Sequence, residues 1–142
     1  MSAPNISVAA RVQLPDILAI YNEVIRNTTA VYSDEEVTLA NREAWFDAKA
    51  AVGLPVLVAS DDSGVTGFAT FGEFRAWPCY RHSVEHSVHV RQDQRGRGVG
   101  TALVKNLFPL AAAMGKHVMI GHMTYEAAGR VILGMEPEFP FF

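Results

Sequence analysis

The sequence predicts an α/β fold in which a mixed sheet is flanked by helices, in one domain. Three observations lead to this class. Two segments near the N-terminus have the periodicity or the end signals of helices, five short apolar segments have the character of strands, and a glycine-rich turn joins the clearest strand to a third helix. The expected order along the 142 residues is β-α-α-β-β-β-α-β.

The N-terminal half is expected to contain one strand and two helices. Residues 6–9 form the strand, and apolar residues at i, i+3, i+4 and i+7 spacing predict a helix over residues 14–28. A second helix is expected from Thr38, a good N-cap, to about Val52, because Gly53 can end it.

The middle of the chain has the two-residue period of strands. Residues 55–59 and 65–71 are expected to pair through a hairpin turn at residues 61–64, Asp-Asp-Ser-Gly. A longer connection over residues 73–82 leads to the clearest strand, residues 83–90. In that strand one face carries Val84, His86, Val88 and Val90, and the other carries Glu85, Ser87 and His89.

The turn after this strand is Arg95-Gly96-Arg97-Gly98-Val99-Gly100; a helix to about Met114 and a strand over residues 117–120 follow. The first backbone N–H groups of a helix have no intrahelical partner, and glycines allow an anion to approach them closely. We therefore expect a phosphate or pyrophosphate cradle. The turn fits neither a Walker loop nor a dinucleotide fingerprint. A tight turn with solvated arginines is the alternative, which the flanking strand and helix disfavour.

The composition excludes several classes of protein. A net charge of −3, from 12 Lys+Arg and 15 Asp+Glu, argues against nucleic-acid and anionic-membrane partners. The single Cys79 allows neither an internal disulfide nor a cysteine-based zinc site, and the histidines do not join acidic residues at a metal-ligand spacing, so we expect no metal. With neither a secretory signal nor a transmembrane run, a cytoplasmic protein is expected.

The glycine-rich turn fits the R/Q-x-x-G-x-G/A signature of the GNAT N-acetyltransferases, and the chain resembles that superfamily. The segment Tyr-Arg-His-Ser-Val-Glu-His-Ser-Val at residues 80–88 is similar to the phosphinothricin and methionine sulfoximine acetyltransferase branch. The resemblance covers residues 6–121. It implies a GNAT-like acyl-CoA N-acyltransferase fold, acetyl-CoA as cosubstrate, direct attack by a small amino-acid-like amine, and, as in many relatives, a homodimer.

The resemblance also implies roles for particular residues. Glu85 would act as general base on the attacking amine. The acceptor pocket would be lined by Arg75, Ala76, Trp77, Glu85, His86 and Ser87. Arg75 is suited to hold a carboxylate or a phosphinate. The cofactor would be held by Val88, His89, Val90, Arg95, Gly96, Arg97, Gly98, Val99, Gly100 and Thr101.

Several of these side chains also have a simpler interpretation. Glu85 could face solvent, and His86 could be a core histidine. Trp77 could serve packing alone, and Arg75 could be solvated. For Glu85, the position on a strand that leads to the phosphate-binding turn favours the catalytic interpretation.

Two features depart from the family pattern. Pro109 lies inside the third helix, and we expect a kink or a break over residues 105–109. The resemblance ends after Gly121, which divides the chain into an acetyltransferase domain, residues 1–121, and a divergent tail, residues 122–142. A C-terminal helix and hairpin are expected to be missing, as in a truncated or out-of-frame version of a longer acetyltransferase.

An acetyltransferase for another small amine and a CoA-binding module without turnover are the alternative functions.

Overall fold

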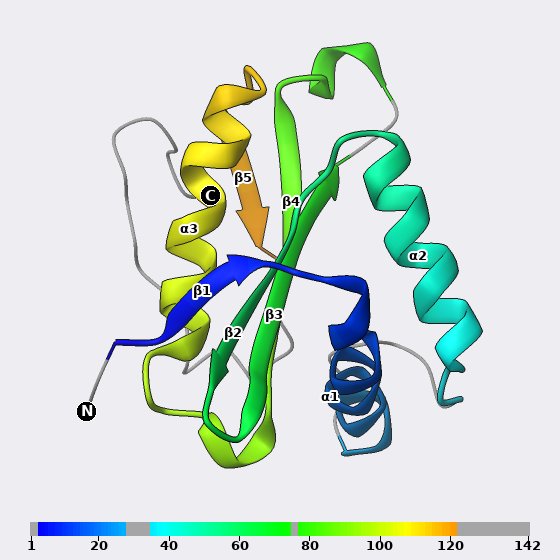
Figure 1. Cartoon of the computed structure of the whole chain (residues 1–142). Helices are drawn as coiled ribbons and strands as arrows, with labels where there is room; N and C mark the ends of the chain where they lie inside the picture. Colours follow the sequence, from blue (N-terminus) through cyan, green and yellow to red (C-terminus); the bar gives the residue numbers. More distant parts are fainter. Residues whose placement is uncertain (1–2, 28–34, 75–76, 122–142) are drawn as a thin grey trace.

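The computed structural model describes residues 3–27, 35–74 and 77–121. Within them, five strands form one mixed sheet in the order β1-β2-β3-β4-β5, which confirms the expected class and element order (Figure 1). Strands β1 to β4 are antiparallel neighbours, and β5 pairs with β4 in parallel. The strands are β1 (Asn5–Val8), β2 (Val56–Asp61), β3 (Gly64–Glu73), β4 (Ser83–Val90) and β5 (Val118–Gly121).

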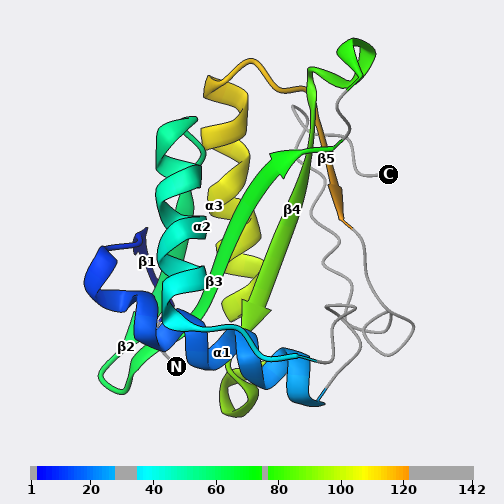
Figure 2. The same ribbon diagram turned by 90° about the vertical axis from the view of Figure 1, so that its right-hand side faces the viewer.

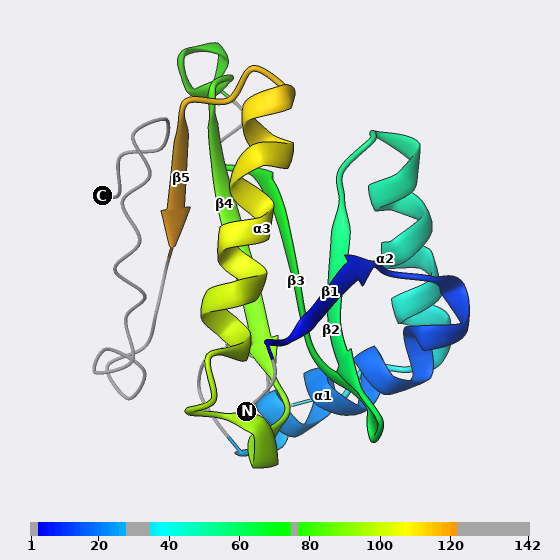
Figure 3. The same ribbon diagram turned by 60° about the vertical axis from the view of Figure 1, so that its left-hand side comes forward.

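Helices cover both faces of the sheet (Figure 3). α1 (Leu14–Asn27) and α2 (Leu39–Ala51) lie on one face, and α3 (Val99–Ala113) lies on the other. Each face has its own core. The α1-side core includes Leu14, Ile17, Val58 and Phe68, and the α3-side core includes Phe71, Val84, Leu103 and Leu107. No helix in the three described ranges is long and apolar enough to cross a membrane.

Local signals set the ends of α2 as expected. The Thr38 side chain caps the helix by accepting a hydrogen bond from the Asn41 N–H at 3.1 Å. Gly53 follows the helix with a φ of +73°, in the left-handed region that favours glycine. The Asn22 amide of α1 pairs with both main-chain groups of Val37, at 2.8 and 2.9 Å, so the segment that leads into α2 is tied to α1.

The sequence predicts a kink or a break over residues 105–109. α3 runs through Pro109 as one helix, so the break is wrong. An interior proline costs about 3 kcal/mol, because it removes one helical hydrogen bond and crowds the preceding turn. Leu107, Phe108 and Ala111, on either side of the proline, are buried against the sheet. Burial of each large apolar side chain contributes about 1.5–3 kcal/mol. Packing on both sides of Pro109 therefore outweighs its local cost.

Gly67 of β3 lets the start of α3 approach the sheet closely. A Cβ atom at this position would lie 3.0 Å from the His89 carbonyl oxygen, 3.1 Å from Leu103 Cδ1 and 3.2 Å from Val99 Cγ1. Side chains from the first turns of α3 thus occupy the space that a larger residue would need. This contact holds the N-terminal end of α3 against β3 and β4 and fixes the position of the glycine-rich turn.

Candidate active site

The glycine-rich turn has a backbone that glycine adopts most readily. Gly96 and Gly98 have φ values of +79° and +82°, and Gly98 is the N-cap of α3. A Cβ atom at either glycine would meet no described atom within 4 Å, so the space around the turn is open. No described side chain caps α3, and its first turn has no acidic residue. The N–H groups of Val99, Gly100 and Thr101 are therefore suited to an anion.

β4 and β5 are paired at one end only (Figure 2). Their parallel register stops at His86↔Gly121, whereas β4 stays paired with β3 as far as Val90. Within the described residues, positions 87–90 of β4 have no strand on their β5 side. We call these four residues the open edge. An edge of this kind presents main-chain N–H and C=O groups that a ligand can bind.

The two faces of β4 differ as the alternation predicts. His89 packs against Tyr21 and Phe68, with ring centroids 5.7 and 5.2 Å apart, so its side chain points to the α1 face. Glu85 and Ser87 share that face through the two-residue period of the strand. Glu85 is half-buried and Ser87 is exposed. Glu85 therefore lies beside the start of the open edge, on the side of the sheet that carries α1 and α2.

The opposite face of β4 packs towards α3. Val84 is fully buried in the α3-side core, and Val88 and Val90 pack against the same core. The imidazole of His86 lies against Gly121 of β5, where an added Cβ atom would be only 2.6 Å from Nε2. His86 thus fills space between the two strands at the point where their pairing ends.

His89 is a half-buried histidine whose ring contacts two aromatic side chains. Burial, followed by the charges of Arg42 and Arg95, lowers its pKa from 6.5 to about 4. Because its ring packs against Tyr21 and Phe68, a ligand at the open edge meets the main chain of His89 and not its side chain. The predicted contact of this residue with a cofactor is thereby limited to backbone groups.

The half-buried His89 is expected to make stability depend on pH between about 6.5 and 4. In this window the unfolded chain binds a proton on the imidazole that the folded state does not bind, so the free energy of unfolding falls with falling pH, by up to about 3 kcal/mol. Chemical denaturation of the wild type and of His89→Phe from pH 7 to pH 4 measures the effect. The difference between the two proteins should change across the window; a constant difference would contradict the assignment.

Arg95 braces the glycine-rich turn. Its Nε donates to the Val90 carbonyl at 3.1 Å, and its Nη2 forms an ion pair with Glu23 of α1 at 2.8 Å. The two side chains are only 27% and 16% exposed, so the alternative of a solvated Arg95 is wrong. Arg97 is exposed on the turn. Glu23 is absent from the predicted site residues, because nothing local marks a helical glutamate as the partner of a residue 72 positions away.

Removal of the Glu23 charge is expected to destabilise the protein. In Glu23→Gln the half-buried Arg95 guanidinium loses its counter-ion, and the free energy of unfolding should fall by about 1–2 kcal/mol. Glu43→Gln is the matched control, since Glu43 pairs with Arg11 in an exposed ion pair, and such pairs contribute about 0–1 kcal/mol. Urea denaturation of both variants measures the free energy of unfolding. Equal losses in the two variants would show that the Glu23–Arg95 pair stabilises the protein no more than an exposed ion pair does.

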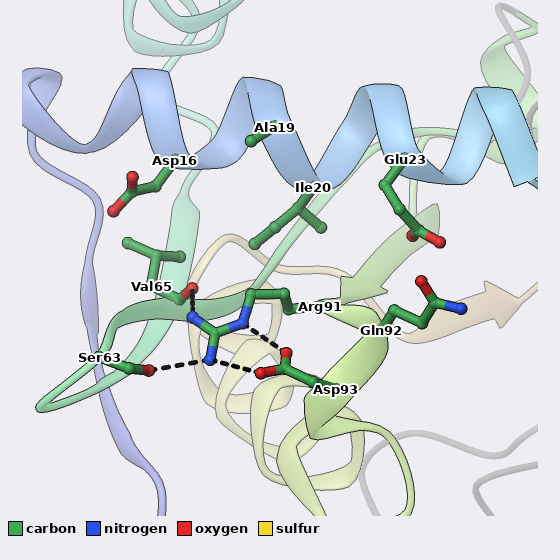
Figure 4. Close-up of a pocket in the computed structure, with 9 residues that line it drawn as sticks. All are labelled: Asp16, Ala19, Ile20, Glu23, Ser63, Val65, Arg91, Gln92 and Asp93. Carbon is green, nitrogen blue, oxygen red and sulfur yellow. Dashed lines mark hydrogen bonds and ion pairs between the residues drawn. The ribbon is translucent and has the colours of Figure 1, made fainter.

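A pocket of about 470 Å³ lies between α1, the β2–β3 hairpin and the segment after β4 (Figure 4). The Arg91 guanidinium in it donates hydrogen bonds to Ser63, to the Val65 carbonyl and to Asp93. Its positive charge is thus paired with the Asp93 carboxylate within the protein. None of the predicted catalytic, acceptor or cofactor residues lines this pocket. Among the described residues, no group of three or more His, Cys, Asp or Glu side chains could hold a metal ion.

The predicted acceptor residues come from two segments that the β3–β4 pairing brings to one end of the sheet. β3 ends at Glu73, which lies opposite Val84, so the connection that follows β3 starts beside Glu85. In this connection Trp77 is 69% exposed, which argues against a role in packing alone. Two further predicted acceptor residues, Arg75 and Ala76, lie outside the described residues.

Comparison of the sequence with known proteins identifies the family to which the chain belongs. The model of the acetyltransferase (GNAT) family matches residues 17–129, a stretch that includes β4, the open edge and the glycine-rich turn. The chain belongs to the GNAT family. It is 46% identical to the L-methionine sulfoximine/L-methionine sulfone acetyltransferase of Pseudomonas aeruginosa, over 99% of this chain and 81% of that protein. The chain is therefore an N-acetyltransferase.

Solved GNAT structures have the same fold. An N-acetyltransferase from Staphylococcus aureus matches with a TM-score of 0.86 and 38% identity, over 91% of this chain and 78% of that one. A phosphinothricin acetyltransferase from Sinorhizobium meliloti in complex with AcCoA matches with a TM-score of 0.74 and 31% identity, over 79% of this chain and 61% of that one. The expected GNAT fold is thus confirmed.

The GNAT similarity continues beyond residue 121. The family match ends at residue 129, and the Pseudomonas aeruginosa relative aligns with 99% of the chain. Residues 122–142 lie outside the described part of the chain. The division into an acetyltransferase domain and a divergent tail, and the missing C-terminal elements, therefore stay predictions.

Proposed function

We propose that this GNAT enzyme transfers the acetyl group of acetyl-CoA to the amino group of a small amino-acid-like substrate, of the methionine sulfoximine or phosphinothricin type. One structural observation supports the proposal most strongly. The open edge of β4 has Glu85 beside its start, and the glycine-rich turn follows its end. A thioester-bearing arm laid along this edge would have its reactive end near a carboxylate and its anionic end near the α3 N-terminus.

The residues of the turn and the open edge fit acetyl-CoA. In the proposal, the N–H groups from Gly96 to Thr101 bind the pyrophosphate, and those of Val88 and Val90 bind the pantetheine arm. The open space at Gly96 and Gly98 and the absence of an acidic side chain from the first turn of α3 support this assignment. Arg97, exposed on the same turn, adds positive charge near the phosphates. Acetyl-CoA supplies an activated acetyl thioester.

Glu85 is proposed to be the general base. An amine can attack the thioester carbon only when it is neutral, so the ammonium form must lose a proton. Glu85 accepts that proton, directly or through one water, while the new C–N bond forms and the C–S bond breaks. The nitrogen gives up a second proton as the amide forms, and this proton passes to the leaving sulfur, so CoA departs as the thiol. No covalent bond to the enzyme is involved, which agrees with a site that needs no nucleophilic thiol. Alignment of amine and thioester along the open edge supplies much of the rate enhancement.

The acceptor pocket is proposed to include Arg75, Ala76 and Trp77 on one side, and Glu85, His86 and Ser87 on the other. Ser87 is exposed at the open edge and can donate a hydrogen bond to a polar substrate group. The His86 side chain lies on the other face of β4, against Gly121, so in this proposal His86 lines the pocket through its main chain. Arg75 would hold an anionic side-chain group of the acceptor, such as a phosphinate, in the bidentate manner of a guanidinium.

Thiol release from acetyl-CoA tests the proposed function. The acceptors are L-methionine sulfoximine, L-methionine sulfone, phosphinothricin and, as contrasts, a polyamine and a peptide amine. We expect turnover with the first three. Turnover with the contrasting amines alone would show that the enzyme acts on a different class of amine. Calorimetric binding of CoA without thiol release from any amine would show that the protein binds CoA but does not catalyse acetyl transfer.

We also propose that the enzyme is a cytoplasmic homodimer that needs no metal and binds neither nucleic acid nor membranes. The support is the resemblance to the family and the net charge of −3. Light scattering coupled to gel filtration tests the dimer. Acetyl transfer that is unchanged by a chelator would agree with the absence of a metal, and loss of activity on chelation would contradict it.

A further inference from the structure

The inner face of α2 carries two positive charges among apolar side chains. Arg42, Trp45, Phe46 and Lys49 follow one another at i, i+3, i+4 and i+7, which places them on one side of the helix. Trp45 and Phe46 pack against the α1-side core. Arg42 and Lys49 form no ion pair with a carboxylate in the described part of the chain. Charged side chains on a sheet-facing helix surface are unusual without such a partner.

Arg42 is held by neutral groups. Its guanidinium donates two hydrogen bonds to the Asn41 side-chain oxygen, at 2.9 and 3.1 Å, and it stacks on the Tyr21 and Trp45 rings, 4.2 and 4.8 Å from their centroids. This cation is therefore part of the packing between α1 and α2. Lys49 has no aromatic contact of this kind among the described residues, so its position calls for a separate explanation.

The Lys49 ammonium lies on the face of the sheet that carries Glu85. Its Nζ donates to the Phe71 carbonyl at 2.8 Å, and a Cβ atom at Gly72 would lie 3.4 Å from it. Gly72 and Glu85 are directly opposite in the β3–β4 register. Opposite residues of an antiparallel pair point to the same face, with Cβ positions about 4.5–5.5 Å apart. Because Gly72 has no side chain, nothing at that position separates Lys49 from the space beside Glu85.

Lys49 has donors left for an anion. An ammonium group has three N–H donors, and the Phe71 carbonyl uses one of them. Burial also lowers the pKa of Lys49, and an arriving anion would compensate for that burial. In an α-amino acid a single carbon separates the amine from the carboxylate. An acceptor whose amine reaches Glu85 can therefore place its carboxylate, a few ångströms away, towards Lys49.

We infer that Lys49 binds the carboxylate of the acceptor and makes the enzyme select amines that carry a free α-carboxylate. The inference rests on the proposed acetyl transfer to an amino-acid-like substrate and adds to it a residue that determines specificity. Lys49 acts here as a binding residue; the proton transfer remains with Glu85. Gly72 is the second residue on which this selection depends, because any side chain there would block the approach of a carboxylate to the Lys49 ammonium.

The test compares two acceptors that differ only in the carboxylate, L-methionine sulfone and its carboxamide, with wild type, Lys49→Met and Lys49→Arg. In Lys49→Met we expect kcat/KM for the sulfone to fall by about 10- to 100-fold, the usual loss for a charge-assisted contact. The value for the carboxamide and the KM for acetyl-CoA should stay unchanged, and Lys49→Arg should recover most of the loss. Lys105→Met is the matched control, since it removes the same charge from an exposed position on α3, across the sheet.

Equal losses for both acceptors in Lys49→Met would overturn the inference, because they would indicate a structural role. No loss for either acceptor would overturn it as well. Calorimetric binding of the two acceptors to the CoA-loaded protein gives a readout that does not need turnover. If wild type fails to release thiol, the proposed function fails. The inference then still stands or falls on whether wild type binds the sulfone more tightly than the carboxamide and Lys49→Met does not.

Discussion

Replacement of Glu85 by glutamine is expected to lower kcat for acetyl transfer by about 100- to 10,000-fold, the range in which a positioned general base acts. Glutamine keeps the size and the polarity of the side chain but cannot accept the proton of the amine. The dissociation constant for CoA should stay unchanged, because the proposed cofactor contacts are backbone groups of the open edge and of the glycine-rich turn. Steady-state thiol release together with calorimetry measures both quantities.

A pH profile separates loss of the base from a general disturbance of the site. In Glu85→Gln the residual rate should rise with pH in step with the fraction of neutral acceptor amine. Glu73→Gln is a suitable control, since Glu73 is an exposed carboxylate at the same end of the sheet whose register partner is Val84, on the α3-facing side of β4. A residual rate that is independent of pH, or an equal loss in Glu73→Gln, would remove Glu85 from the role of base.

Substitution of Gly98 by alanine is expected to raise the dissociation constant for acetyl-CoA by about 5- to 30-fold, because a residue with a Cβ atom held at a φ of +82° costs about 1–2 kcal/mol. The turn would relax towards negative φ and turn its N–H groups away from the pyrophosphate. A Cβ atom at Gly98 meets no described atom within 4 Å, so the folded structure can accept the alanine with backbone strain alone. Isothermal titration calorimetry measures the change in affinity.

Gly115 provides a matched control at the other end of α3. It has a φ of +77°, and a Cβ atom there would also meet no described atom within 4 Å. Gly98→Ala and Gly115→Ala should therefore lower the free energy of unfolding by similar amounts, about 1–2 kcal/mol each. Only the first should weaken acetyl-CoA binding. Equal affinities in the two variants would contradict the assignment of the turn as the cofactor site.

Much of the fold could be predicted because its signals are local. The bounds of β4, residues 83–90, agree with the alternation of apolar and polar residues. The cap of α2 at Thr38 and the turn at Gly96 and Gly98 depend on backbone and side-chain chemistry within a few residues. The effect of Pro109 was not predictable in this way, because it is decided by the packing of α3 on the sheet.

The parts of the site that sequence reasoning missed depend on contacts between distant residues. Arg95 fits the family signature, but its partner Glu23 is 72 positions away. The proximity of Lys49 to the Glu85 face becomes visible only with the register that sets Gly72 opposite Glu85. One signal was available: two cations at i and i+7, with Trp45 and Phe46 between them, indicate a charged inner face of a helix.

The most direct test of acetyl transfer at this site is thiol release from acetyl-CoA in the presence of L-methionine sulfoximine, with mass spectrometry of the product. The structure predicts release that requires both compounds and yields one N-acetylated amino acid for each thiol. Binding of CoA without thiol release from any amine in the panel would contradict it.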